Sequence, residues 1–291
     1  MRQSQENRYM RHLTWFGAAS LLVVTLMVLL TCSLQGPQVV VVTGNGVTAE
    51  AGTKNRSIDA VDHSIWDRLL HKYVDGDGMV NYAAWKASSA DRTALRDYLV
   101  SLGQVDPDAP ATKEGKLAFW INAYNALTIY GILDVYPTSS IRNHTARVFG
   151  YNIWKDLLLP VGNRKYSLDA IEHQVLRKLG EPRIHFAVVC ASKGCPRLRN
   201  EAYTREKLEE QLADNTRDFF ARPKNLQVDF AHRAIQVSAI LHWFGQDFGP
   251  TPREALASLA AYLPNDATRR LILSGDFSVS FLDYDWSLNE Q

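Results

Sequence analysis

The sequence lacks an excess of charge of either sign and has only three cysteines. Its 32 basic residues are balanced by 31 acidic ones, for a formal net charge of +1. Proteins that bind nucleic acid usually show a clear basic excess, so this balance argues against that class. No internal repeat, low-complexity tract or acidic tail stands out. With hydrophobic residues at 46%, a chain of 291 residues can bury the core of one large domain or two small ones.

Charged residues are missing from a long stretch near the N-terminus. After Arg11 no Asp, Glu, Lys or Arg occurs until Glu50, and the apolar run of residues 13–34 lies in this gap. A run of about 20 apolar residues can span a bilayer as a helix. Residues 1–12 form a basic leader, which predicts a cytoplasmic N-terminus. We therefore predict a signal anchor over residues 13–34, with the folded part membrane-anchored on the periplasmic side of an inner membrane.

Two other export routes fit the same segment. A signal peptide could be cleaved at TCS, where Thr31 and Ser33 flank the cut. A lipoprotein would carry its lipid on Cys32, although Thr31 stands where Gly, Ala or Ser is usual before that cysteine. Residues 35–61, which mix Gly, Thr and Asn, then predict a linker to a folded domain of residues 62–291.

The folded part predicts more helix than strand. Helical spacing of apolar residues or helix-capping signals occur in residues 62–74, 91–102, 117–137, 167–180, 204–223, 239–248 and 253–263. Residues 226–238 alternate around AHRA and predict a hairpin. The nearly continuous apolar run RIHFAVVC, residues 183–190, predicts a strand buried on both faces. Because helices and strands mix without βαβ alternation, we predict an α+β fold: a helix-rich single domain packed on a small mixed or antiparallel sheet.

The helix predicted at residues 167–180 carries a carboxylate inside its apolar face. Glu172 falls between Leu168 and Leu176 at helical spacing. A carboxylate buried there must find a cation or strong donors, or else stay protonated. Glu172 is therefore the structural partner of an arginine, a functional carboxylate or simply exposed, and His173 lies on the flank of the same face.

Residues 185–195 contain the residue types that thiol chemistry requires. In a strand, His185 and Cys190 would face opposite sides, so they should not pair directly. Cys195 follows the SKG turn and can return to either face. Because a nucleophilic thiol needs a nearby base or positive field, we predict Cys195 as the nucleophile, paired with His185 or His173.

Three other interpretations of the cysteines stay open. Outside the cytoplasm Cys190 and Cys195 can oxidise to a disulfide, since Cys32 lies in the membrane segment and no other pair is left. They can also be inert buried thiols. As metal ligands they would join His173 and His185, but the spacing does not match the paired C-x-x-C pattern of a zinc site, and we predict neither a metal nor a cofactor.

Two asparagines interrupt the long apolar helix predicted at residues 117–137. Asn122 and Asn125 lie one turn apart on one face, and a buried amide left without partners costs about 1–3 kcal/mol. In the structural interpretation they fix neighbouring backbone. In the functional interpretation they meet Glu172 and His185 and hold the amide or carbonyl of a substrate.

Aromatic and acidic residues mix in two C-terminal segments. HWFGQDFG contains Trp243 and Asp247, and FLDYDWSLN contains Asp283 and Asp285. Surface acids would explain each carboxylate separately. The mixture with Trp and Tyr instead predicts a buried polar network or the rim of a pocket.

These motifs together resemble an uncharacterised family, domain of unknown function 547. The resemblance rests on AFWINAYNALTIYGIL, YSLDAIEHQVLR, RIHFAVVCASKGCPRLRNEAYT, ILHWFGQDFG and FLDYDWSLN, in this order. It implies one domain from about Asp62 to the C-terminus, with the anchor outside it. The candidate site residues that lie in its signature segments are Asn122, Asn125, Glu172, His173, His185 and Cys195. The family has no assigned activity, so the resemblance carries no catalytic role over. A looser analogy links the order of helix and strand to papain-like and transglutaminase-like enzymes, but no cysteine occurs in the helix here.

Besides a purely structural envelope protein, in which pocket substitutions would alter only stability, two hypotheses follow for a membrane-tethered domain with a polar pocket. The first is a thiol-dependent hydrolase or acyl transferase, with Cys195 as nucleophile, His185 as base and Glu172 as orienting group. The second is a non-catalytic envelope protein that binds a small polar ligand or a peptide, with Cys190 and Cys195 oxidised. In both, the residues expected to contribute to binding are Asn122, Asn125 and His173.

Overall fold

The apolar segment that contains the two asparagines forms the central helix of the fold. The computed structural model describes residues 40–43, 56–146 and 150–291. Helix α5 (Lys113–Val135) begins at Thr112, whose hydroxyl accepts a hydrogen bond from the backbone N–H of Gly115, and it ends before Pro137. Nearly every side chain along α5 is buried, as expected for a helix that is apolar all the way round.

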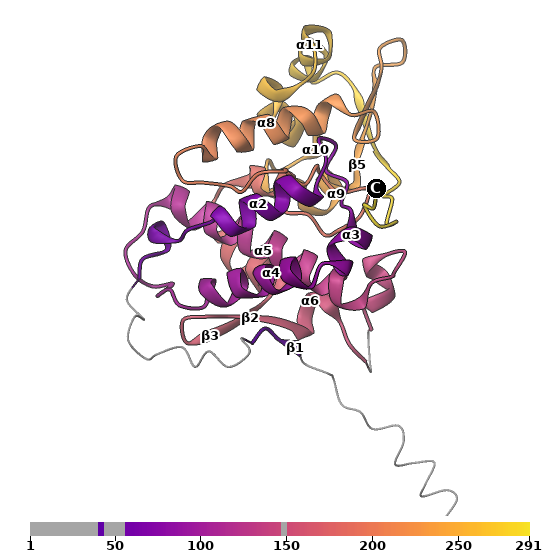
Figure 1. Cartoon of the computed structure of the whole chain (residues 1–291). Helices are drawn as coiled ribbons and strands as arrows, with labels where there is room; N and C mark the ends of the chain where they lie inside the picture. Colours follow the sequence, from indigo (N-terminus) through magenta and orange to yellow (C-terminus); the bar gives the residue numbers. More distant parts are fainter. Residues whose placement is uncertain (1–39, 44–55, 147–149) are drawn as a thin grey trace, which may run out of the picture. The chain divides into compact units, whose positions relative to one another are not determined.

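The other helices of the described chain are shorter. They are α2 (Ser64–Tyr73), α3 (Tyr82–Ala87), α4 (Ser89–Leu102), α6 (Ile153–Asp156), α7 (Leu168–Ala170), α8 (Leu208–Ala221), α9 (Ala239–Phe244), α10 (Pro252–Ser258) and α11 (Asp266–Ser274). Figure 1 shows α2 and α4 beside α5, and α8, α10 and α11 grouped together in orange and yellow. Side-chain caps start most of these helices; in α4, for example, the hydroxyl of Ser88 accepts a hydrogen bond from the backbone N–H of Asp91.

The strands form two small mixed sheets in the described part of the chain. The first contains β1 (Val40–Val41), β2 (Leu157–Val161) and β3 (Arg164–Ser167), with β1 parallel and β3 antiparallel to β2. The second contains β4 (Leu226–Asp229), β5 (Ala234–Ser238) and β6 (Ser278–Leu282). The predicted hairpin of residues 226–238 is confirmed as β4 and β5, and β6 adds in parallel to β5. The α+β class is thus confirmed, although the sequence predicted one sheet and the structure has two.

The strand predicted at residues 183–190 is not formed. Pro182–Phe186 is a short 3₁₀ helix, capped by the side chain of Glu181, and no strand pairs with the residues that follow. Proline has no N–H to lose at the first position of a helix, which favours this start. The buried backbone beyond it is bonded by the amides of Asn125 and Asn215 instead of by a neighbouring strand.

The helix predicted at residues 167–180 is confirmed, and its middle is irregular. The hydroxyl of Ser167 caps it, and Gly180 ends it in the left-handed conformation, with φ of 65°. Between α7 and the last turn, Ile171–Leu176 is a π-helix. Such turns are rare and occur frequently at functional sites. Glu172 lies in this one.

The apolar core consists of two clusters of buried side chains. The larger cluster surrounds α2, α4 and α5, and the smaller one lies among α8–α11 and β4–β6. Tyr284, which follows β6, packs against both clusters. The junction of the two clusters is where a pocket opens.

None of the helices in the described residues is both long and apolar enough to cross a bilayer. The signal anchor predicted at residues 13–34, and most of the linker predicted at residues 35–61, lie outside the described residues.

Candidate functional site

The two asparagines of α5 brace backbone. Asn122 donates a hydrogen bond to the carbonyl of Tyr203 (2.7 Å) and accepts one from its N–H (3.0 Å). Asn125 donates to the carbonyl of Ala187 (3.0 Å) and accepts from the N–H of Val189 (2.9 Å). Both amides are buried, and each ties down an irregular segment that has no sheet partner there. Neither asparagine lines the pocket, so the structural interpretation describes their contacts.

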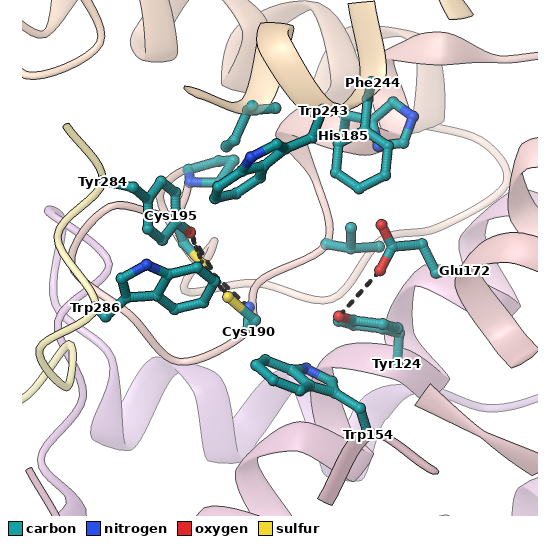
Figure 2. Close-up of a pocket in the computed structure, with 13 residues that line it drawn as sticks. Tyr124, Trp154, Glu172, His185, Cys190, Cys195, Trp243, Phe244, Tyr284 and Trp286 are labelled. Atoms are coloured by element: carbon teal, nitrogen blue, oxygen red, sulfur yellow. Dashed lines mark hydrogen bonds between the residues drawn. The ribbon is translucent and has the colours of Figure 1, made fainter. Parts of the chain in front are cut away.

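A cavity of about 160 Å³ opens where the two core clusters meet. Its walls are Tyr124, Trp154, Glu172, His185, Val188, Cys190, Cys195, Pro196, Ile240, Trp243, Phe244, Tyr284 and Trp286. Figure 2 shows the two thiols on the side of Tyr284 and Trp286, with Glu172 and His185 on the other side. The three residues predicted as catalytic, Cys195, His185 and Glu172, therefore line one cavity.

The sulfur of Cys195 lies among several hydrogen-bonding groups. The hydroxyl of Tyr284 donates to it (3.1 Å), and so does the backbone N–H of Cys190 (3.1 Å). The hydroxyl of Ser192 lies 3.2 Å away and the sulfur of Cys190 lies 2.9 Å away. Both cysteines are free thiols, and Cys195 is buried whereas Cys190 is partly exposed.

These contacts favour the thiolate form of Cys195. Burial alone raises the pKa of its thiol, but hydrogen bonds from Cys190, Ser192 and Tyr284 outweigh burial and bring the pKa down to about 6. The pKa of Cys190 is raised, first by its hydrogen bond to Cys195 and then by burial. The pair therefore carries one negative charge, which lies on Cys195, while Cys190 keeps its proton.

The loop that carries the thiols is held by the C-terminal tail. The N–H of Lys193 donates to the carbonyl of Ser287, and the N–H of Gly194 donates to the carbonyl of Asp285, both at 2.8 Å. A Cβ atom at position 194 would lie 2.9 Å from the ring of Tyr284, so only glycine allows this approach. The tail thus fixes both the loop and the tyrosine that donates to Cys195.

Glu172 projects from the π-helical turn into the cavity. Its carboxylate accepts a hydrogen bond from the hydroxyl of Tyr124 (3.3 Å). Burial raises its pKa to about 7, and the hydrogen bond from Tyr124 opposes that rise only in part. Arg177 lies near enough to lower the pKa slightly, but its guanidinium is bonded to Asp247. Glu172 can therefore hold or release a proton near neutral pH, which is what a general acid or base requires.

His185 does not contact Cys195. Its Nε2 lies 2.8 Å from Asp247, and its ring stacks on Phe244 with centroids 4.1 Å apart. Burial lowers the pKa of the imidazole to about 4, so the ring is neutral and Nε2–H donates to the carboxylate. Its Nδ1 is buried without a hydrogen-bond partner. The predicted thiol–imidazole pair is thus not formed in the resting geometry.

His173 lies outside the cavity wall. It is about 40% exposed, with Nε2 3.9 Å from Asp169 and Nδ1 3.3 Å from Arg177. The helical geometry placed it on the flank of the apolar face, and the structure agrees. The centroid of its ring lies 6.1 Å from that of Phe244, which does line the pocket.

Aromatic side chains make up much of the wall. Trp243 and Phe244 come from α9, Trp154 from α6, and Tyr284 and Trp286 from the tail after β6. The mixture of Trp, Tyr and Asp in the C-terminal segments predicted a pocket rim, but it did not indicate that Ser192, Tyr124 and Tyr284 would bond the candidate residues. Those partners come from segments far apart in the sequence, and only the fold brings them together.

No group of three or more His, Cys, Asp and Glu side chains that could hold a metal ion occurs among the described residues. The two sulfur atoms of the cavity are engaged with hydroxyls and with each other, and Nε2 of His185 is engaged with Asp247, whereas Nδ1 of His185 has no partner.

The comparisons with known proteins agree with the sequence motifs. Residues 109–220 match the model of a family described as protein of unknown function, DUF547, and the chain resembles that family. The match contains α5, the π-helical turn, the thiol loop and most of α8, but not the C-terminal segments that complete the pocket. No curated protein and no solved structure matches the chain.

The pKa shifts of the site make a prediction about stability. The pKa of Glu172 is raised by burial from 4.5 to about 7, so the folded protein keeps a proton that the unfolded chain loses. The contribution of Glu172 to the free energy of unfolding therefore falls as pH rises between those values. The pKa of His185 is lowered to about 4 by burial. Its contribution to the free energy of unfolding is therefore fully present above pH 6.5 and is lost as pH falls towards 4. His63, which is also shifted to about 4 by burial, acts in the same direction as His185.

The contribution of Glu172 should therefore offset that of one histidine between pH 4.5 and 6.5. We expect Glu172→Gln to steepen the loss of unfolding free energy on acidification by up to about 1.4 kcal/mol per pH unit. Urea unfolding at a series of pH values measures both slopes. Equal slopes for the two proteins would show that Glu172 is ionised in the folded state throughout this range.

Proposed function

We propose that the chain is a membrane-tethered protein whose folded domain faces outward and catalyses thiol-dependent hydrolysis or acyl transfer. The observation that carries the catalytic part is the set of donors around Cys195 in a cavity that also contains Glu172. A stabilised thiolate supplies the nucleophile, and a carboxyl group with pKa near 7 supplies a proton donor. The tether rests on the apolar run of residues 13–34.

In the proposed reaction Cys195 is the nucleophile and Glu172 transfers the protons. The thiolate of Cys195 attacks the carbonyl carbon of an acyl donor, forming a C–S bond. The bond to the leaving group then breaks, and Glu172 gives its proton to that group. Water or an acceptor nucleophile attacks the thioester, the ionised Glu172 takes its proton, and the C–S bond breaks to restore the thiolate.

Glu172 fits the proton-transfer role better than His185. The imidazole donates its proton to Asp247, and the shift of its pKa to about 4 by burial makes it a weak base at neutral pH. Glu172 has no such competing partner, since its one hydrogen bond is donated by Tyr124. We therefore assign His185 to the wall of the pocket, where it bonds Asp247, which is itself held by Arg177.

A second candidate is a non-catalytic binding protein with the cysteines oxidised. The 2.9 Å separation of the two sulfur atoms favours it, because a disulfide between Cys190 and Cys195 would need little movement. In an oxidising compartment such a bridge would remove the nucleophile and leave the pocket to bind a small polar ligand or peptide.

One labelling experiment tests the tether and the nucleophile together. Sealed spheroplasts that contain the full chain are treated with a membrane-impermeant thioester, and peptide mass spectrometry locates the acyl group. We expect acylation of Cys195 without lysis. Acylation only after lysis would contradict the outward orientation, and absence of acylation in detergent-solubilised, reduced protein would contradict the nucleophile.

A further inference from the structure

The wall of the pocket is rich in aromatic rings and contains no lysine or arginine among the described residues. Six of its residues are aromatic, namely Tyr124, Trp154, Trp243, Phe244, Tyr284 and Trp286. No lysine or arginine is among the wall residues in the described chain. Each ring presents a face of negative potential, which attracts cations. The wall is thus built of surfaces that favour positive charge.

The ionisable groups of the pocket have the same preference. Glu172 and Cys195 become negative when they lose a proton, and His185 is bonded to Asp247 outside the wall. Arg177, the nearest guanidinium to Glu172, makes two hydrogen bonds to Asp247, of 2.7 and 2.6 Å. The two acids of the cavity therefore lack a positive partner within it.

The pocket offers few polar groups for a neutral ligand such as a sugar. The hydroxyl of Tyr124 bonds Glu172, and the hydroxyl of Tyr284 bonds Ser192 and Cys195. The indole N–H groups can only donate, so the carboxylate of Glu172 is the main acceptor left. A ligand that gains from ring faces and one carboxylate, without needing many hydrogen bonds, is an organic cation.

We infer that this pocket binds a compact alkylammonium group between its aromatic rings and the carboxylate of Glu172. The inference rests on the proposed function, because the bound amine would lie beside the acyl-thiol of Cys195. A cavity of about 160 Å³ is close to that which encloses one benzene-sized guest, so it fits an ammonium head and not a large ligand. The tryptophans are suited to the role: Arg142, which is not a wall residue, already lies over Trp286 at 5.2 Å.

Binding is tested on the full chain in detergent at pH 8 by quenching of tryptophan fluorescence and by calorimetry. The probes are choline and its neutral isostere 3,3-dimethyl-1-butanol, and Nα-acetyl-lysine methylamide with the norleucine analogue. We expect at least one cation to bind about tenfold or more tightly than its neutral partner. Equal or tighter binding of the neutral probes would overturn the inference. Preference for choline indicates a free small amine, and preference for the lysine derivative indicates a protein side chain.

Three pocket variants and one control variant separate the possible causes. Trp243→Ala removes an exposed ring at the mouth and should weaken cation binding about fivefold or more, whereas Phe230→Ala, an exposed ring outside the pocket, should not. Glu172→Gln should reduce the preference for the cation over its isostere. Cys195→Ala should still bind the cation, so loss of acylation and loss of cation binding are read independently. A Trp243→Ala protein that binds as tightly as the Phe230→Ala control would contradict the cage.

Discussion

Replacing Cys195 by alanine is expected to abolish acylation of the protein and any turnover of a thioester substrate. Removal of a catalytic nucleophile costs about 10⁴-fold or more in rate, because the remaining groups only bind and polarise the substrate. The side chain contacts Cys190, Ser192 and Tyr284, and its truncation leaves these groups able to bond one another. We therefore expect the folded protein to persist, and the rate of thiol release from a thioester measures the loss.

Cys190→Ala is the matched control for that variant. It removes the neighbouring thiol but keeps the nucleophile and the backbone N–H that donates to it. Loss of one hydrogen bond to a charged group is worth about 1.5–3 kcal/mol, which raises the pKa of Cys195 by about one to two units. Activity should survive, with its pH profile moved upward. Equal inactivation by both substitutions would indicate that the two cysteines act as a redox pair and not as nucleophile and neighbour.

Asn125→Ala is expected to destabilise the protein by about 2–6 kcal/mol, because two buried backbone groups lose their partner and each costs about 1–3 kcal/mol. Those groups are the carbonyl of Ala187 and the N–H of Val189, in the segment between the 3₁₀ helix and Cys190. Without these two hydrogen bonds the segment is less rigidly held, which should also slow alkylation of Cys195. Chemical unfolding and alkylation with iodoacetamide measure the two effects.

Asn122→Ala provides the comparison. It removes two hydrogen bonds of the same kind, but at Tyr203, away from the wall of the pocket. We expect a similar loss of unfolding free energy with little change in the reactivity of Cys195. If either variant kept full stability while ligand binding fell, the asparagines would be binding residues and the bracing role would be wrong.

Local signals in the sequence predicted much of the fold. The helix of residues 167–180 has its serine cap and its left-handed glycine where capping chemistry places them, and the alternation of residues 226–238 produced the hairpin. The apolar run of residues 183–190 misled because strand, 3₁₀ helix and buried loop can all be apolar. What decides among them is whether a strand or an amide side chain satisfies the backbone, and Asn125 lies far away in the sequence.

For the site too, the sequence predicted individual residues but not their contacts. Glu172 is predicted as a site residue because a carboxylate on an apolar face needs a cation or strong donors. Cys195 is predicted because a thiol occurs near histidines in the sequence. The partner chosen for Cys195 was His185, since nothing in the sequence connects either residue to Tyr284 or Asp247. Those contacts depend on how the C-terminal tail and α9 pack, and the pattern of a single segment cannot predict that packing.

The most direct test of the account is the pH profile of Cys195 alkylation in the full chain, with free thiols counted by intact mass before and after unfolding. We predict that Cys190 and Cys195 are both free, with Cys195 alkylated along a curve whose midpoint is near 6, as its hydrogen bonds from Cys190, Ser192 and Tyr284 require. A bridge between Cys190 and Cys195 in freshly purified protein, or a midpoint at the ordinary value of about 8.5, would contradict the nucleophile on which the proposed function depends.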